Sequence, residues 1–241
     1  MKDYSQSGEQ KIILDYFGYP DKIRGLKDPC ALDIGANDGV LLSNSRALVE
    51  LGWNAVLVEP AEIAFRKLVT NNLGIGGAAL TDYFKGDVAE FMRAITDGLV
   101  VAPNARVKLV QAAITTTDGP IDFYDSGTHL KKGDTSLLST TRPEEMARWK
   151  KSGEVFTKTT VRGITVAALL KETGLTRADF VSIDCEGVDL SVLQQLDLTA
   201  LQTRMVCVEV NRNDQRPFDE YCAKHGLRLL HRNFENAIYC V

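Results

Sequence analysis

Apolar residues along the chain follow two spacings. Short runs that are apolar at almost every position predict buried strands, at residues 30–34, 55–59, 107–114, 180–183 and 205–211. Between these runs, apolar residues recur at every third or fourth position and predict amphipathic helices, at residues 41–51, 61–71, 166–172, 190–196 and 218–225. Strands that alternate with helices in this way predict an α/β fold with an open, mostly parallel sheet.

Both ends of the chain depart from this alternation. Residues 1–28 form a lead-in, in which the apolar residues between positions 12 and 17 fit one face of a helix. Residues 227–230 and 237–241 are short strands separated by a polar turn, which predicts a closing antiparallel hairpin. The length of 241 residues is compatible with one large domain, and we predict a single domain.

The first predicted strand leads into a turn with glycine at both ends, Gly35 and Gly39. Glycine lets the backbone approach a ligand closely, and a helix that follows would offer free N–H groups. The turn therefore predicts a nucleotide-type cofactor site, although such a pattern also occurs in ordinary turns. The spacing G-x-x-x-G differs from that of dinucleotide sites. Asp33 and Asp38 would repel a pyrophosphate but suit a cationic or hydroxyl-rich ligand.

The second predicted strand ends in an acidic residue, Glu59, which is followed by Pro60. An acidic residue about 20 positions after the glycine turn is where such folds bind a ribose diol. A carboxylate can accept hydrogen bonds from two vicinal hydroxyls at once. We therefore predict that Glu59 binds ribose, with capping of the next helix as the alternative.

The third predicted strand carries Gln111 and Ala112 near its carboxyl end. An adenine ring placed there would meet a backbone amide or a short polar side chain. Upstream of this strand, Asp87 and Glu90 have the spacing of a helix N-cap, and we favour that role for Asp87 over cofactor binding.

A second acidic cluster follows the predicted strand at 180–183, where Asp184 and Glu186 precede Gly187. Strand alternation would place both carboxylates on one side, at the edge of the sheet where ligands bind. Carboxylates buried there need a ligand, a metal or hydrogen-bond donors, although helix capping is an alternative. Glu209 and Asn211 end the next strand, so a magnesium ion held with Asp184 is a further hypothesis that we do not favour.

Residues 125–162 have a different composition, with many Ser and Thr residues and eight Lys/Arg against five Asp/Glu. A long polar connection in a compact domain is either functional or disordered. We predict either a lid over the substrate pocket or a solvated basic excursion. If the segment is a lid, His129 and Trp149 are the side chains expected to touch a substrate.

Composition excludes several other classes of protein. A net charge of −4 gives no reason to expect nucleic-acid binding. No apolar run reaches the length of a membrane span, and residues 1–10 lack a signal-peptide core. The five cysteines are scattered, and four lie in apolar runs, which predicts buried free thiols and a cytoplasmic protein. Their spacing to histidines does not suit a zinc site.

Four stretches of the chain occur in the order of one family's motifs. They are Ser5-Gln6-Ser7-Gly8-Glu9, Leu32-Asp33-Ile34-Gly35-Ala36-Asn37-Asp38-Gly39, Gly52-Trp53 leading to Val58-Glu59-Pro60, and Ser182-Ile183-Asp184-Cys185-Glu186-Gly187. Together they resemble the FkbM-type methyltransferases, a branch of the S-adenosylmethionine-dependent class. Two positions depart from the family pattern: Ser182 stands where Lys is frequent, and Gln10 where Asp is usual. The first departure argues against chemistry by a lysine at this position, and the second concerns local packing.

The resemblance implies a Rossmann-like class I methyltransferase fold, with a mostly parallel seven-stranded sheet, helices on both faces and a closing antiparallel hairpin. It implies that the glycine turn holds the methionine part of S-adenosylmethionine and that Asp184 lies beside the transferred methyl group. The candidate cofactor ligands are Asp33, Gly35, Ala36, Asn37, Asp38, Gly39, Glu59, Pro60, Gln111, Ala112 and Asp184.

Family members typically methylate hydroxyl groups, so the resemblance implies O-methylation of a small molecule, sugar or other natural product. We predict Asp184 or Glu186 as the base or acceptor-orienting group, with alignment of donor and acceptor as the dominant effect. The alternatives are a nicotinamide-dependent oxidoreductase and a cofactor-binding module without catalysis. The sequence leaves the acceptor and the oligomeric state open.

Overall fold

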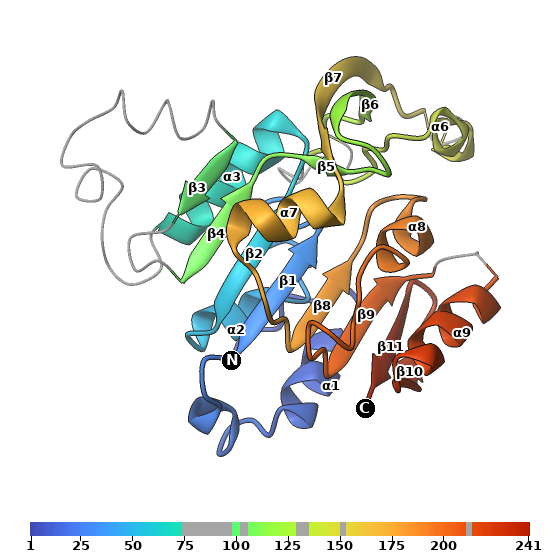
Figure 1. Ribbon diagram of the computed structural model, residues 1–241. Helices are drawn as coiled ribbons and strands as arrows, with labels where there is room; N and C mark the ends of the chain where they lie inside the picture. The colour runs from blue at the N-terminus through green and yellow to red at the C-terminus, as the bar shows by residue number, and fades with distance from the viewer. Residues whose placement is uncertain (74–97, 102–105, 129–134, 150–152, 211–213) are drawn as a thin grey trace.

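The computed structural model describes residues 1–73, 98–101, 106–128, 135–149, 153–210 and 214–241 (Figure 1). Its main sheet has eight strands in the order β10-β11-β9-β8-β1-β2-β4-β3. These strands are β1 Cys30–Ile34, β2 Asn54–Val58, β3 Leu99–Val101, β4 Val107–Val110, β8 Phe180–Ile183, β9 Met205–Glu209, β10 Arg228–Arg232 and β11 Asn236–Cys240. The five central strands, β9 to β4, are parallel.

Helices cover both faces of this sheet, as Figure 1 shows. They are α1 Glu9–Tyr16, α2 Arg46–Glu50, α3 Glu62–Leu73, α7 Val166–Thr173, α8 Asp189–Leu193 and α9 Arg216–Lys224, with a 3-10 turn at Ile23–Gly25. Alternate residues of each strand point to opposite faces of the sheet and so belong to two hydrophobic cores. Ala31 belongs to the core under α1, α2 and α3, and Leu32 to the core under α7, α8 and α9. Every residue of β1, β8 and β9 is buried, as expected for parallel strands covered on both faces.

The closing hairpin is present. Strand β11 pairs antiparallel with β9, and β10 pairs antiparallel with β11. The sheet exceeds the expected seven strands because Leu99–Val101 adds an antiparallel edge strand beside β4. In the described part of the chain, no helix is long and apolar enough to span a membrane.

Two predicted boundaries are wrong. The apolar run at 107–114 is not one strand, because β4 ends at Val110 and β5, Ala113–Ile114, pairs with a second sheet. The helix predicted from residue 41 begins only at Arg46. At residues 40 and 41 the chain forms a turn instead, in which Asp38 Oδ1 accepts the N–H groups of Val40 and Leu41, each at 2.8 Å.

The second sheet consists of β5, β6 Gly119–Asp125 and β7 Thr157–Ile164, in the order β5-β7-β6. It stands beyond the carboxyl ends of the main strands in Figure 1, next to the helix α6, Pro143–Trp149. The 125–162 segment therefore includes α6 and most of β7. Its role as a lid stays a prediction. The helix cap predicted at Asp87 and Glu90 lies outside the described residues.

Candidate functional site

A pocket of about 280 Å³ lies where the parallel strands end. This volume is near the lower end of the range for small-molecule sites, roughly 300–1,000 Å³. The pocket is lined by residues 33–37, 41–44, 59–60, 112–114, 136–141 and 184–186, and by Gln6, Phe123, Arg148, Trp149, Ser182, Val188, Glu209 and Glu235. Strand ends are the expected ligand site of an open α/β sheet.

Gly35 allows two strand ends to approach each other at the base of the pocket. Its φ of +87° lies in the region that favours glycine. A Cβ atom at this position would lie 1.7 Å from the backbone oxygen of Asp184. The N–H of Asp184 in turn donates to the carbonyl oxygen of Ile34 at 2.9 Å. The glycine therefore brings the first motif against the second.

The glycine turn uses its own amides within the protein. The N–H groups of Gly35 and Ala36 both donate to the Val58 oxygen at 2.9 Å. The N–H of Asn37 donates to Glu59 Oε2 at 2.9 Å. Because α2 starts beyond the turn, the expected helix N-terminus with free N–H groups is not at residue 41. The turn therefore contributes shape to the pocket rather than a row of free donors, and the strand before it contributes the Asp33 carboxylate.

Glu59 is the acid at the end of β2, and only 5% of its surface is exposed. Its second oxygen, Oε1, accepts the N–H of Ala61 at 2.7 Å, so the helix-capping alternative is realised in the structure. Burial raises the pKa of Glu59 to about 8, against the lowering effect of its two amide donors. Each oxygen keeps a second lone pair that a ribose hydroxyl can use, and ribose binding stays a prediction.

The other predicted cofactor ligands divide into two groups. Asp33, Asn37, Pro60 and Ala112 line the pocket with Gly35 and Ala36, whereas Asp38, Gly39 and Gln111 are outside its lining. Asp38 uses one oxygen to hold the turn, and the Gln111 N–H donates to the Gly98 oxygen at 2.8 Å. A Cβ atom on Gly39 would lie 2.5 Å from Leu68, so this glycine permits packing against α3.

Asp33 lines the pocket, and 4% of its surface is exposed. Its Oδ2 accepts the hydroxyl hydrogen of Ser45 at 2.5 Å. Burial raises the pKa of Asp33 to about 6, although hydrogen bonds from Ser45 and Ser182 oppose the shift. Ser182, which departs from the family pattern, thus supports a buried carboxylate.

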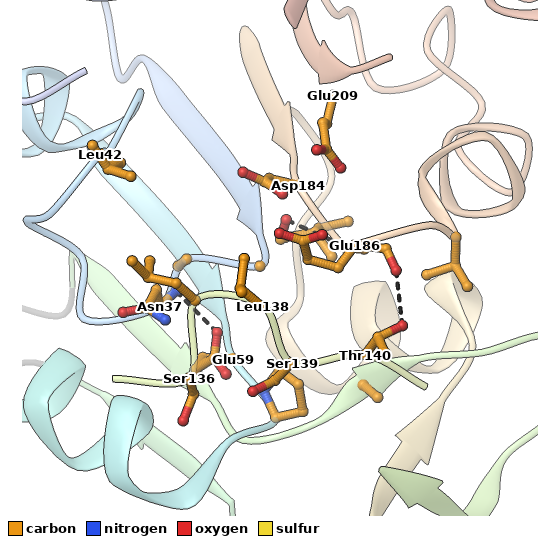
Figure 2. Close-up of a pocket in the computed structure, with 18 of the residues that line it drawn as sticks. Asn37, Leu42, Glu59, Ser136, Leu138, Ser139, Thr140, Asp184, Glu186 and Glu209 are labelled. Atoms are coloured by element: carbon orange, nitrogen blue, oxygen red, sulfur yellow. Dashed lines mark hydrogen bonds between the residues drawn. The ribbon is translucent and has the colours of Figure 1, made fainter. Parts of the chain in front are cut away.

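Asp184 and Glu186 both line the pocket, on the same side as Glu209 (Figure 2). Burial of the surroundings and the charges of Asp189 and Asp33 raise the pKa of Asp184 to about 7, although its side chain is open to the pocket. Burial and the charge of Asp184 raise the pKa of Glu186 well above its usual range. The two carboxyls are therefore close enough to disfavour simultaneous ionisation.

The loop after β8 is held by a third acid, Asp189, at the start of α8. Asp189 accepts the N–H groups of Cys185 at 2.6 Å and Gly187 at 3.1 Å. Burial raises its pKa to about 6, even though these two amides lower it. Asp189 thus shapes the loop that carries Glu186.

Oxygen atoms of Asp184, Asp189 and Glu209 lie within 4.8 Å of one another, which is the arrangement of a candidate cation site. This set contains Asp184 and Glu209 of the hypothesised magnesium ligands, and Asp189 in addition. The third hypothesised ligand, Asn211, lies outside the described residues. Asp189 already accepts two backbone N–H groups. The arrangement alone does not establish a metal site, since acidic groups cluster without one in many proteins.

The second sheet and α6 supply the outer wall of the pocket. Thr140 Oγ1 donates to the Glu186 backbone oxygen at 2.8 Å, as drawn in Figure 2. Asp125 holds the neighbouring loop by accepting from Ser136, Ser139 and the Gly127 N–H at 2.7, 3.1 and 2.9 Å. Trp149 lines the pocket as expected for a substrate contact, whereas His129 lies outside the described residues.

Several lining residues were missed by sequence reasoning. Gln6 and Glu235 come from opposite ends of the chain and meet at the pocket because buried Glu9 joins the two segments. Asn233 and Asn236 both donate to Glu9 Oε1, at 2.5 and 2.9 Å. The acidic motif Ser-Gln-Ser-Gly-Glu was the available signal, but no local pattern indicates its partner in the hairpin.

The family model described as the methyltransferase FkbM domain matches residues 33–235. The chain belongs to the FkbM methyltransferase family. Membership confirms the prediction of a methyltransferase, and the mostly parallel sheet agrees with the predicted Rossmann-like fold. The family match does not support the alternative of an oxidoreductase. No curated protein matches this FkbM methyltransferase.

Two solved structures resemble this FkbM methyltransferase at low identity. One, the METTL16 MTase domain, has a TM-score of 0.42 and 12% identity, over 95% of this chain and 64% of that one. The other, the delta-N METTL16 MTase domain, has a TM-score of 0.40 and 11% identity, over 95% and 80% of the two chains. The FkbM methyltransferase thus spans less than two thirds of the first neighbour's length. We base no functional conclusion on either.

The family implies S-adenosylmethionine as cofactor, and the pocket of this FkbM methyltransferase fits it. The lining acids suit a cationic sulfonium, and Glu59 suits a ribose diol. Among the described residues, Asn44 Oδ1 and Glu186 Oε2 are buried oxygens at the pocket without a hydrogen-bond partner. Because orphaned buried oxygens are costly, a bound molecule with donors would stabilise the site.

Proposed function

We propose that this FkbM methyltransferase transfers the methyl group of S-adenosylmethionine to a hydroxyl oxygen of a small molecule, sugar or other natural product. The observation that carries the proposal is Asp184, a carboxyl open to the pocket at the end of β8 with its pKa raised to about 7. A base with a pKa near neutrality accepts a proton in the transition state more effectively than an ordinary carboxylate does.

When bound, S-adenosylmethionine would supply an electrophilic methyl group, and its sulfur would keep the electron pair of the bond that breaks as the acceptor oxygen takes the methyl group. The hydroxyl proton passes to the Asp184 carboxylate. Glu186 Oε2 is buried whereas Asp184 is open to the pocket, so we assign Glu186 an orienting role rather than that of the base.

The proposed binding of S-adenosylmethionine is tested by Glu59→Gln, which keeps one acceptor oxygen. We expect affinity for S-adenosylhomocysteine, measured by calorimetry, to fall by about 1–3 kcal/mol because a ribose hydrogen bond is lost. Glu62→Gln is the control, because Glu62 starts α3 with 67% of its side chain exposed. Donor affinity that is equal in the two variants would remove the ribose assignment.

The proposed role of Asp184 as the base is tested by Asp184→Asn. The readout is release of S-adenosylhomocysteine in the presence of a cell extract. Turnover of the native protein should rise between pH 6 and 8, because Asp184 must be ionised to accept a proton. The variant should lose about 10²–10⁴-fold in rate together with this pH dependence. A native pH profile retained by the variant would show that another group is the base. The labelled product of the extract identifies the acceptor.

We further propose that transfer proceeds without magnesium and that the protein acts in the cytoplasm on a small molecule rather than on nucleic acid. The buried cysteines Cys30, Cys207, Cys222 and Cys240 are all free thiols, which supports a reducing compartment. Turnover should survive EDTA, and its loss with recovery on adding Mg²⁺ would reinstate the metal hypothesis.

A further inference from the structure

We infer that the acceptor of this methyltransferase carries a protonated amine, which the carboxylates around the ends of β8, β9 and β11 hold in the pocket. The inference rests on the proposed hydroxyl methylation and adds the charge of the substrate to it.

The first observation is the charge of the lining. Six acidic residues and one basic residue, Arg148, line the pocket within the described part of the chain. The acids are Asp33, Glu59, Asp184, Glu186, Glu209 and Glu235. Arg148 offsets part of this charge, because it lowers the pKa of Glu186, but its guanidinium also lies 3.6 Å from Glu145, which is outside the lining. Burial raises the pKa of Glu59 to about 8 and that of Asp184 to about 7, so the empty pocket carries fewer than six negative charges near neutral pH. A cation beside these acids favours their ionised form, and one sulfonium in the donor compensates only one of them.

The second observation is an acid that the fold leaves without a partner. Asp33 and Glu59 receive hydrogen bonds from Ser45 and from backbone amides. By contrast, Glu186 Oε2 is buried and has no partner among the described residues. Protonation does not resolve this, because a carboxylic acid hydroxyl also needs an acceptor. A ligand that brings N–H donors into the pocket satisfies the group.

An ammonium fits this lining better than a metal ion does. Asp189, the third member of the compact acidic set, is outside the pocket lining and holds two backbone amides. The acids that do line the pocket are spread over the ends of different strands, and an ammonium has three donors to distribute among them. Apolar side chains such as Leu42 and Leu138 line the same pocket and suit a carbon skeleton.

The charge also selects which atom is methylated. An amine surrounded by carboxylates stays protonated and has no lone pair for attack on a methyl carbon. A hydroxyl on the same molecule keeps its lone pairs and can lose its proton to Asp184. The acidic pocket thus favours an aminated alcohol, such as an amino sugar or amino polyol, methylated on oxygen.

A matched series of four-carbon probes tests the inference on the full chain saturated with S-adenosylhomocysteine. The probes are 4-amino-1-butanol, 1,4-butanediol and 4-hydroxybutanoate, which differ only in the charge at one end. We expect the amine to bind at least tenfold more tightly than the diol in calorimetry at low salt, and the acid to bind most weakly. Equal affinities, tighter binding of the diol or the acid, or no detectable binding of the amine would overturn the inference.

Variants locate the effect. Glu235→Gln should reduce the preference for the amine at least threefold, whereas Glu62→Gln on the exposed face of α3 should leave it unchanged. A preference that persists in Glu235→Gln and also in Asp184→Asn would place the amine elsewhere and overturn the inference. Millimolar Mg²⁺ or Ca²⁺ that displaces the amine and itself binds through Asp184 would show that a metal is the cation.

The proposed function fails separately. If S-adenosylhomocysteine does not bind, the methyl-transfer proposal is lost, whereas the preference for the amine can still be measured on the free protein. If the donor binds and the amine shows no preference, only the substrate class is wrong.

Discussion

The absence of a Cβ atom at Gly35 allows the turn after β1 to approach the backbone of Asp184 closely. Replacement by alanine forces a Cβ to within 1.7 Å of the Asp184 oxygen, and the contact is with backbone rather than with a flexible side chain. Gly35→Ala should therefore lose roughly 1–2 kcal/mol from its left-handed φ and roughly 1–3 kcal/mol from overpacking. Chemical denaturation measures the loss, and calorimetry should show that donor binding is abolished.

Gly226→Ala separates backbone strain from the clash. Gly226 has a φ of +79°, and a Cβ there meets nothing within 4 Å. Gly226→Ala should lose only the roughly 1–2 kcal/mol that comes from its left-handed φ, and it should bind the donor normally. Equal effects in the two variants would mean that the close approach to Asp184 is unimportant.

At the residue scale, the sequence predicted which acids gather but not what each carboxylate bonds. Asp33, Glu59 and Asp184 lie in one pocket because each lies at or next to the carboxyl end of a parallel strand, and these ends share an edge. Asp38 belongs to the same motif yet holds the amides of Val40 and Leu41. A short motif does not reveal whether a side chain turns toward a ligand or back to its own loop.

Among the elements, the lead-in and the hairpin are joined by one buried acid, Glu9, of which 0% is exposed. Burial alone would raise the pKa of Glu9, but hydrogen bonds from Ser7, Asn236 and Asn233 lower it overall. Glu9→Ala leaves the buried Asn236 and the partly buried Asn233 without this acceptor. We expect a loss of about 2–4 kcal/mol in the free energy of unfolding.

Glu62→Ala is the matched control for Glu9. Its carboxylate pairs with Arg66 at 2.6 Å, but both side chains are more than half exposed. Such a pair contributes roughly 0.5 kcal/mol or less. Similar losses for Glu9→Ala and Glu62→Ala would contradict the role assigned to the buried acid.

The outer wall depends on Thr140, which donates to the Glu186 oxygen and accepts the Arg142 N–H at 3.0 Å. Thr140→Val keeps the shape but loses both bonds, at a cost of about 1–3 kcal/mol. Hydrogen exchange at residues 136–149 should accelerate at least tenfold. Thr159→Val, on the exposed part of β7, should leave this exchange unchanged; if it does not, the wall is not held through Thr140.

The element pattern was predictable where burial is uniform. The strands β1 and β8 have the predicted bounds because parallel strands buried on both faces give unbroken apolar runs. The same rule fails at residues 107–114, where two strands of different sheets follow each other and only Lys108 and Gln111 interrupt the apolar residues. The break at Gln111 depends on pairing with Gly98 and Gly163, which no local pattern records.

For the whole molecule, the acids of the site make stability depend on pH. Burial raises the pKa of Asp33 and Asp189 to about 6 and that of Glu59 to about 8. The unfolded chain ionises these groups near pH 4, so the folded protein holds more protons between pH 4 and 8. Stability of the ligand-free protein should therefore fall as pH rises through this window.

Calorimetric melting at fixed ionic strength checks this dependence between pH 5 and 8, where the melting temperature should decrease with rising pH. Glu59→Gln should flatten the upper part of the curve, since Glu59 has the highest of the raised pKa values. Exposed Asp214 pairs with Arg216, and Asp214→Asn should not alter the slope. A melting temperature that rises with pH would mean that the site acids are ionised in the fold, and that cations already compensate them.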